Sequence, residues 1–233
     1  MKKYAIIVAG GTGSRMKGDV PKQFMLLGGK PVILYSIEAF YNTDPEIQIF
    51  LVLHPEYQEY WKQLSKDFKI TIPTKIARGG ETRFESVKNG LDCIEGEGYV
   101  AIHDAARPVI NAAFIKKIFA EAEKYGSAMP GIALNETIRI IEGDDTRQLD
   151  RTVLRAMQTP QVYKVSELKE AYKLPFTPFF TDDASVMQSA GFPLHLTDGR
   201  PGNIKITHAS DLAVAEALLT IQANEETEKP DET

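Results

Sequence analysis

The chain has 233 residues, of which 43% are hydrophobic, and its formal charge at pH 7 is −5. This size suits one sizeable core, so we expect a single domain over residues 1–221. The single cysteine, Cys93, excludes an internal disulfide and a cysteine metal cluster. No apolar run reaches the roughly 18 residues of a membrane span, and the first residues lack the layout of a signal peptide. We therefore expect a cytoplasmic protein without a membrane partner.

The negative charge is concentrated at the C-terminus. Between Gln222 and Thr233, five acidic residues stand against one lysine, which gives −4 and leaves −1 for the rest of the chain. Such a polar stretch, with Pro230 inside it, predicts a disordered acidic tail over residues 222–233. The nearly neutral remainder has no basic stripe with interleaved aromatic residues, so we expect no nucleic-acid partner.

An apolar stretch near the N-terminus runs directly into a glycine-rich segment. Residues 5–9 read Ala-Ile-Ile-Val-Ala, and Gly10-Gly11-Thr12-Gly13-Ser14-Arg15 follows, with Lys22 a little further on. Glycines let backbone N–H groups approach phosphate oxygens, and the two cations can hold a polyphosphate. The segment predicts a site for a nucleoside triphosphate. An ordinary strand-to-loop turn is the alternative.

Neither of two common glycine-rich phosphate motifs fits this segment. A P-loop closes with Gly-Lys-Ser/Thr, whereas Gly13-Ser14-Arg15 is followed by Met16. The dinucleotide fingerprint requires a third glycine where Met16 stands. The predicted phosphate site therefore belongs to another class.

Predicted strands alternate with predicted helices along the middle of the chain. We expect helices over residues 31–41, 55–68 and 83–94, the last one opening after Gly79-Gly80, and strands over residues 47–53 and 99–103. This alternation is typical of βαβ units. It predicts an α/β fold with a mostly parallel sheet.

The strand over residues 99–103 leads into the polar run His103-Asp104-Ala105-Ala106-Arg107-Pro108. Ligands bind at the carboxyl ends of such strands, so Asp104 is placed to orient a substrate or to bind Mg²⁺ through its oxygen atoms. The alternative is a structural ion pair between Asp104 and Arg107 that caps the next helix. We expect His103 to pack or to form hydrogen bonds rather than to act as a base.

Residues 136–155 alternate polar and apolar side chains on both sides of a turn-rich segment, residues 142–145. This pattern predicts a β-hairpin, with the second strand over residues 149–155. Because such a hairpin has little core of its own, we expect a β-arm that packs on another copy of the chain in a homodimer. Its polar residues serve either a shared site or the solvated surface: Thr137, Arg139, Arg151 and Arg155.

A last polar cluster precedes the C-terminal helix that we expect from Asp211 onwards. It contains Thr181-Asp182-Asp183 and, further along, Lys205 between Ile204 and Ile206. In a short strand Lys205 would point away from its apolar neighbours and into a site. An exposed lysine at the edge of the sheet is the alternative.

Taken together, these motifs resemble the 2-C-methyl-D-erythritol 4-phosphate cytidylyltransferase family. They occur in order from about residue 3 to residue 220: residues 10–16, 21–23, 79–80 with Ser86, 103–108, 150–151, 159–161, 181–182 and 203–207. The resemblance implies a Rossmann-like nucleotidyltransferase fold and a homodimer joined through extended arms. It also implies CTP and a polyol phosphate as substrates, with Mg²⁺ as cofactor.

The resemblance further implies a role for each site residue. The catalytic residues would be Arg15, Lys22, Arg151 and Lys205, of which Arg15 and Lys22 stabilise the transition state. The nucleotide would bind Ala9, Gly10, Gly11, Thr12, Gly13, Gly79, Gly80 and Ser86. The polyol phosphate would bind Asp104, Ala105, Arg107, Thr137, Arg151, Thr159, Thr181 and Lys205, with Thr137 and Arg151 supplied by the partner's arm. Asp104 would also lie beside the metal.

Two alternatives stay open at this point. Where the family often has Pro-Ala-Ala-Gly, this chain has Val8-Ala9-Gly10-Gly11, a form that also resembles ribitol-5-phosphate cytidylyltransferase. The intact runs 104–108 and 203–205 favour methylerythritol phosphate. The other alternative is a non-catalytic nucleotide-binding protein on the same fold. It would lack at least one charged site residue, yet all five are present: Arg15, Lys22, Asp104, Arg151 and Lys205.

Overall fold

The computed structural model describes residues 1–11 and 20–227. Its centre is an eight-stranded sheet, in which β12 (Leu196–Asp198) pairs with β7. The other strands follow the order β10 (Arg155–Met157), β7 (Ser127–Ala133), β11 (Gln161–Lys164), β6 (Tyr99–Asp104), β1 (Lys3–Ala9), β4 (Gln48–Leu53) and β5 (Thr74–Arg78). The neighbours β6, β1, β4 and β5 are parallel, whereas β11 is antiparallel to β6 and β7, and β10 to β7. The predicted α/β fold with a mostly parallel sheet is confirmed.

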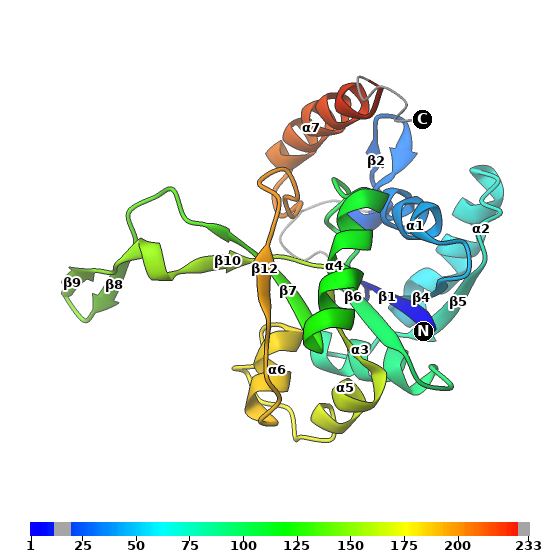
Figure 1. Cartoon of the computed structure of the whole chain (residues 1–233). Coiled ribbons are helices and arrows are strands. Elements are labelled where there is room, and N and C mark those ends of the chain that lie inside the picture. Colours follow the sequence, from blue (N-terminus) through cyan, green and yellow to red (C-terminus); the bar gives the residue numbers. More distant parts are fainter. Residues whose placement is uncertain (12–19, 228–233) are drawn as a thin grey trace, which may run out of the picture.

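Helices cover both faces of this sheet (Figure 1). One face, which includes Ala5 and Ile7, packs against α1 (Val32–Thr43), α2 (Gln58–Asp67) and α4 (Ala112–Tyr125). The other face, which includes Tyr4 and Ile6, packs against α3 (Arg83–Asp92), α5 (Val165–Ala171) and α6 (Asp183–Ser189). Successive side chains of β1 thus enter opposite cores, which explains why the strand reads as a continuous apolar run.

The predicted elements lie close to the observed ones. The first predicted helix begins after Pro31, and the second is a 3-10 turn, η2 (Pro55–Tyr57), followed by α2. The strand β6 is one residue longer than predicted and ends on Asp104. Two short strands, β2 (Leu26–Leu27) and β3 (Lys30–Pro31), pair with each other between the 3-10 turn η1 (Lys22–Phe24) and α1.

The C-terminal helix α7 (Ser210–Thr227) is longer than the sequence analysis predicted. Its residues Leu212, Ala215, Leu218 and Leu219 pack against a small apolar cluster beside α1. The disordered tail predicted from residue 222 onwards is therefore wrong for residues 222–227. Alanine, glutamine and glutamate all favour helices, so the helix continues through this polar stretch. Residues 228–233 lie outside the described part of the chain.

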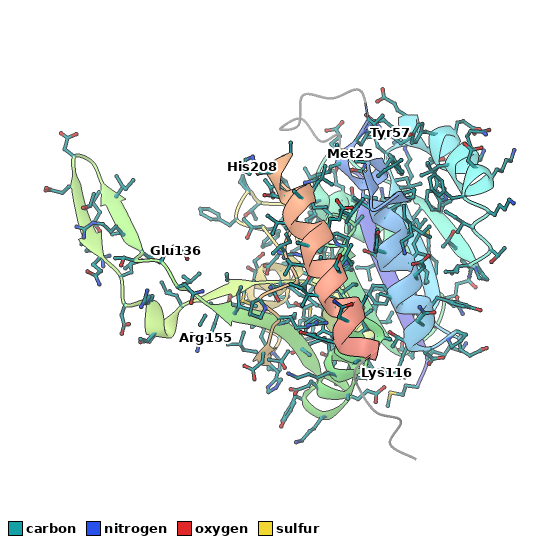
Figure 2. All side chains as sticks on the ribbon, turned by 90° about the horizontal axis from the view of Figure 1, so that it is seen from above. Met25, Tyr57, Lys116, Glu136, Arg155 and His208 are labelled. Atoms are coloured by element: carbon teal, nitrogen blue, oxygen red, sulfur yellow. The ribbon has the colours of Figure 1, made fainter. Side chains whose placement is uncertain are left out.

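The predicted arm is a hairpin that projects from the body of the molecule (Figures 1 and 2). It consists of β8 (Arg139–Glu142) and β9 (Asp145–Gln148), joined by a turn in which Gly143 has φ +64°. The return strand predicted over residues 149–155 is wrong, because the tight turn at Gly143 brings residues 145–148 into register instead. Residues 151–153 form a 3-10 turn, η3 (Arg151–Val153), that leads into β10.

The helices differ widely in length, from 7 residues in α5 to 18 in α7. None in residues 1–11 and 20–227 is both long and apolar enough to cross a membrane.

Candidate active site

Two cavities lie next to each other at the carboxyl ends of β1 and β6. The first, of about 260 Å³, is lined by the turn after β1 and by the start of α3. We call it the nucleotide cavity, after the ligand that the sequence analysis predicts for its glycine-rich lining. The second, of about 360 Å³, is lined by residues that follow β6, β10 and the α5–α6 connection. We call it the polyol cavity, because several residues predicted to bind a polyol phosphate line it. Three residues line both cavities: Arg83, Asp104 and Lys205. The cavities therefore share a wall made of charged side chains.

Backbone groups make up much of the nucleotide cavity. Ala9, Gly10 and Gly11 line one side, and Gly80 and Ser86 line the other. The N–H of Gly80 donates a hydrogen bond to Ser86 Oγ (3.1 Å). A Cβ atom at Gly10 would lie 2.9 Å from the same oxygen, so the close approach of these two segments requires glycine.

Gly79 lies behind the lining rather than in it. Its N–H donates to Leu53 O (2.7 Å), and a Cβ atom would lie 3.1 Å from the backbone at Leu53 and His54. Gly79 thus lets the end of β5 pack closely against the end of β4. This brings Gly80 to the nucleotide cavity.

The 3-10 turn η1 fixes the other edge of the nucleotide cavity. The Gln23 side chain is 3% exposed, and its Nε2 donates to the carbonyls of Ala9 (2.9 Å) and Gly11 (3.2 Å). Lys22 Nζ donates to Ile206 O (3.0 Å) and lines the cavity. The sequence analysis assigned no role to Gln23. Gln23 could have been found from its position, because it stands next to Lys22 in a short segment between the glycine-rich stretch and α1.

Asp104 is the centre of the shared wall. Its Oδ1 accepts from Arg83 Nε (3.1 Å), and its Oδ2 accepts from Lys205 Nζ (2.6 Å). Burial by itself would raise the pKa of Asp104, but the charges of Arg83 and Lys205 outweigh it and hold that pKa well below its usual range. The carboxylate is therefore ionised throughout the physiological pH range.

The alternative ion pair between Asp104 and Arg107 is not what the structure shows. Arg107 instead donates to two carbonyl oxygens, Asn203 O (2.8 Å) and Met157 O (3.4 Å). The guanidinium thus ties two loops together at the rim of the polyol cavity. The two oxygens of Asp104 accept from Arg83 and Lys205 and not from Arg107.

Lys205 points into the site, as predicted, but the predicted strand around it is wrong. Residues 203–207 form no strand; the segment is held by the N–H of Ile206, which donates to Ala106 O (2.8 Å). Ile206 is fully buried. The buried Ile206 side chain and the hydrogen bond of the Ile206 N–H hold the segment against the loop after β6. Lys205 therefore points toward Asp104 although residues 203–207 pair with no strand.

His103 and Thr159 support the wall from behind. Thr159 Oγ1 accepts the N–H of Asp104 (3.1 Å) and lies 3.1 Å from His103 Nδ1, while His103 Nε2 lies 3.1 Å from Arg107 O. Burial lowers the pKa of His103 to about 4, so the ring is neutral at pH 7 and donates to Arg107 O from Nε2. The prediction that His103 forms hydrogen bonds is confirmed.

The remaining predicted site residues divide into three groups. Ala105 lines the nucleotide cavity, whereas Arg107, Thr159 and Thr181 line the polyol cavity. Thr137 and Arg151 lie on the arm and line neither cavity of their own chain; Arg151 Nη1 donates to Asn135 O. Thr12, Gly13 and Arg15 lie outside the described residues.

The wall contains one residue to which the sequence analysis assigned no role, Arg83. Arg83, the first residue of α3, binds Asp104 and also donates from Nη2 to Asp183 Oδ2 (2.7 Å). The pattern Thr82-x-x-Glu85 is a capping box. It could have located Arg83 in the first turn of a helix that faces the site, but not its two partners.

The carboxylates present suit a cation that arrives with a phosphate ligand. In the part of the chain that the structure describes, no cluster of three or more His, Cys, Asp or Glu side chains is arranged to hold a metal ion. Both oxygens of Asp104 are engaged by cations. Mg²⁺ is commonly held by one or two carboxylates together with substrate phosphates, and Asp104 can contribute to a site of that kind.

The architecture is that of a nucleotidyltransferase: the carboxyl edge of a mostly parallel sheet offers backbone donors for a nucleotide beside cations for phosphate groups. Comparison with known proteins makes this class specific. The family model described as IspD: 2-C-methyl-D-erythritol 4-phosphate cytidylyltransferase matches residues 4–221. The chain belongs to this family and is a cytidylyltransferase.

Individual relatives agree with the family model over nearly the whole chain. The 2-C-methyl-D-erythritol 4-phosphate cytidylyltransferases of Bacteroides thetaiotaomicron and Bacteroides fragilis are each 46% identical, over 94% of this chain and 100% of theirs. The crystal structure of the enzyme of that name from Thermus thermophilus has a TM-score of 0.76 and 27% identity, over 94% of this chain and 100% of that one.

Proposed function

We propose that this chain joins CTP and 2-C-methyl-D-erythritol 4-phosphate to give 4-diphosphocytidyl-2-C-methyl-D-erythritol and pyrophosphate. An oxygen of the polyol phosphate attacks the α-phosphorus of CTP, and the bond from that phosphorus to the β-phosphate oxygen breaks. CTP occupies the nucleotide cavity and the polyol phosphate occupies the polyol cavity. The observation that carries this assignment is the shared wall, because two cations and a carboxylate between adjacent cavities suit two anionic substrates bound side by side.

Catalysis then consists of positioning two anions that repel each other and of balancing the charge on the transferred phosphorus. Lys22 and Lys205 both line the nucleotide cavity, and Lys205 also lines the polyol cavity. Their positive charges suit this role, and Arg15 of the glycine-rich segment is assigned to it by family resemblance. Loss of one such contact typically costs roughly 3 to 4 kcal/mol of barrier, or about a hundredfold or more in rate.

Mg²⁺ enters this proposal with the triphosphate of CTP. When bound, it neutralises charge on the phosphate oxygens. Asp104 is the wall carboxylate that can face such an ion, because it lines both cavities. Its oxygens accept hydrogen bonds from Arg83 and Lys205, which keep the carboxylate in place.

The proposal includes a homodimer in which each arm completes the partner's site. The arm exposes two large apolar side chains, Ile141 (76%) and Val153 (77%), which is unfavourable for an isolated arm and favours burial against another copy. The partner's Thr137 and the partner's Arg151 would then reach the polyol phosphate. The cytoplasmic location and the lack of a nucleic-acid partner stay predictions.

Pyrophosphate release with CTP and Mg²⁺ tests the reaction, with methylerythritol phosphate and ribitol 5-phosphate supplied in separate assays. We expect release with methylerythritol phosphate alone. Release with ribitol 5-phosphate alone would contradict the proposal. Silence with both, together with measurable CTP binding, would leave only a nucleotide-binding function.

A further inference from the structure

A row of charged and polar groups runs from the core of the molecule into the shared wall of the two cavities. We infer that Arg83 is a positioning residue, which uses the buried Asp183 as an anchor to hold Asp104 and, through it, to set where the polyol phosphate lies relative to the nucleotide. This inference rests on the proposed function, because it names the residue that aligns the two substrates of that reaction.

The two ends of the row differ in burial. The side chain of Asp183 is completely buried, that of Asp104 is 12% exposed, that of Arg83 is 24% exposed and that of Lys205 is 40% exposed. Asp183 lines neither cavity, whereas the other three residues line both. The buried end therefore has no access to substrate, and its effect on the reaction passes through Arg83.

Asp183 is a fixed anchor. Its Oδ2 accepts from Arg83 Nη2 (2.7 Å), and its Oδ1 accepts from the hydroxyl of Tyr172 (2.6 Å). Burial, with Asp183 beside it, raises the pKa of Tyr172, so this hydroxyl keeps its proton and donates. Asp183 also begins α6, whose N-terminus is closed by the capping box of Asp182 and Ser185. Both oxygens of the anchor are thus occupied by groups from the protein.

Arg83 is fixed by its backbone as well. Thr82 Oγ1 accepts the N–H of Glu85 (3.1 Å), and Glu85 Oε2 accepts the N–H groups of Glu81 (2.7 Å) and Thr82 (3.3 Å). This capping box holds the first turn of α3, so the guanidinium reaches its partners from a defined origin. The same turn carries Ser86 of the nucleotide cavity. A shift of Arg83 would therefore move the wall relative to the nucleotide.

Only arginine suits this position. The guanidinium directs Nε to Asp104 at the end of β6 and Nη2 to Asp183 at the start of α6. A lysine has one nitrogen and cannot reproduce this planar, two-directional geometry. Charge alone therefore does not explain the residue, and Arg83→Lys should fail to restore what Arg83→Gln loses.

The test compares Arg83→Gln, Arg83→Lys, Asp183→Asn and Tyr172→Phe with wild type in steady-state kinetics. For Arg83→Gln and Arg83→Lys we expect kcat/KM for methylerythritol phosphate to fall by roughly 10- to 100-fold, the scale of lost charged hydrogen bonds. Asp183→Asn and Tyr172→Phe change residues that line neither cavity. These two variants should lower kcat/KM for methylerythritol phosphate by a smaller factor and leave the KM for CTP within about threefold of wild type. Lys88→Gln, on the exposed side of α3, is the matched control and should change nothing.

A double-mutant cycle separates positioning from direct substrate contact. If Arg83 acts through Asp104, the losses in Arg83→Gln and Asp104→Asn will not add in the double variant. Additive losses, or an unchanged kcat/KM for methylerythritol phosphate in both Asp183→Asn and Tyr172→Phe, would overturn the inference. Because neither of the last two variants alters a cavity lining, they keep the test valid if Arg83→Gln does not fold.

A second readout does not depend on turnover, so failure of the inference can be told apart from failure of the proposed function. Crystal structures of wild type, Asp183→Asn and Lys88→Gln measure the distance from Arg83 Nε to Asp104 Oδ1, which is 3.1 Å in the wild-type chain. Loss of the charged anchor should lengthen or break this contact in Asp183→Asn, whereas Lys88→Gln should leave it unchanged. An unchanged contact in Asp183→Asn would overturn the inference even for an enzyme that proves inactive with methylerythritol phosphate.

Discussion

The edge of the sheet and the arm both carry predicted site residues, but they hold them in different ways. At the sheet edge, Asp104 has partners on α3 and in the 203–207 segment, and most of its side chain is buried. On the arm, polar residues bind each other across the hairpin: Arg139 donates to Thr146 (2.8 Å) and Arg147 to Glu142 (2.9 Å). These side chains are exposed. The edge is therefore preformed within one chain, whereas the arm is folded locally and lacks a surface to lie against.

This difference indicates two routes to a catalytic geometry. The wall residues are aligned by the folding of one chain. A substitution in the wall should therefore impair the site of the same chain that carries the substitution. In the proposed homodimer the arm residues are aligned on docking, so a substitution on the arm should impair the site of the neighbouring chain. Substitutions in each region test this division.

The largest effect is expected at the sheet edge, for Lys22→Ala. Lys22 lines the nucleotide cavity, and its proposed role is to balance charge on the transferred phosphorus, so kcat should fall by about a hundredfold or more. Pyrophosphate release at saturating substrates measures this effect. Lys66→Ala, on the exposed side of α2, is the control. Turnover within a few-fold of wild type would remove Lys22 from the catalytic residues.

Mixed dimers test the arm directly. Arg151→Ala and Lys205→Ala chains should each be nearly inactive alone, because every site in either homodimer lacks one of the two cations. In a random one-to-one mixture, half of the dimers are heterodimers with one intact site, so activity should recover to about a quarter of wild type. No recovery after confirmed subunit exchange would show that each chain supplies its own Arg151.

The same division explains what could be predicted from the sequence. Asp104 was predictable because it ends an apolar strand, and such ends collect ligands in α/β sheets. The direction of Lys205 followed from the polarity of its neighbours, although the cause is a buried Ile206 and not a strand. Local pattern determines which side chain leaves the core. Its partner on another element does not follow from that pattern.

The missed features depend on tertiary contact or on one backbone angle. Arg83 and Asp183 stand 100 positions apart, and their pairing depends on how the starts of α3 and α6 meet. The hairpin register depends on the positive φ of Gly143, which pairs Glu142 with Asp145, whereas polar alternation alone fits several registers. The polar end of α7 was assigned to the tail because its composition is also typical of disorder.

A smaller effect is expected from His103 on the pH dependence of the free energy of unfolding. Its pKa is about 4 in the folded chain against an ordinary value of 6.5, so the unfolded chain binds more protons between these values. His103 therefore contributes to the free energy of unfolding above pH 6.5. This contribution, up to roughly 3 kcal/mol, is lost as the pH falls from 6.5 to about 4. Urea unfolding at pH 7, 5.5 and 4.5 measures the loss.

His103→Gln should flatten this pH dependence, because glutamine does not titrate. His208→Gln, which changes an exposed histidine, should leave it unchanged. Equal slopes for wild type and His103→Gln would show that the ring is not the group responsible.

The smallest effect is expected within the nucleotide cavity, for Ser86→Ala. The variant leaves the N–H of Gly80 without its acceptor, but this group faces a cavity that water can enter, so the KM for CTP should rise only about three- to tenfold. The KM for methylerythritol phosphate should not change. Loss of affinity for both substrates would mean that the two cavities are not separate.

The same serine explains the glycine opposite. A Cβ atom at Gly10 would lie 2.9 Å from Ser86 Oγ and 3.7 Å from Ser86 Cβ. Gly10→Ala should therefore weaken CTP binding more in the wild-type chain than in Ser86→Ala, where only the more distant carbon remains. Equal costs in both backgrounds would show that the backbone conformation at Gly10, and not the serine oxygen, requires glycine. The double-mutant cycle thus decides whether this cavity is closed by side-chain contact across two loops or by the path of one loop alone.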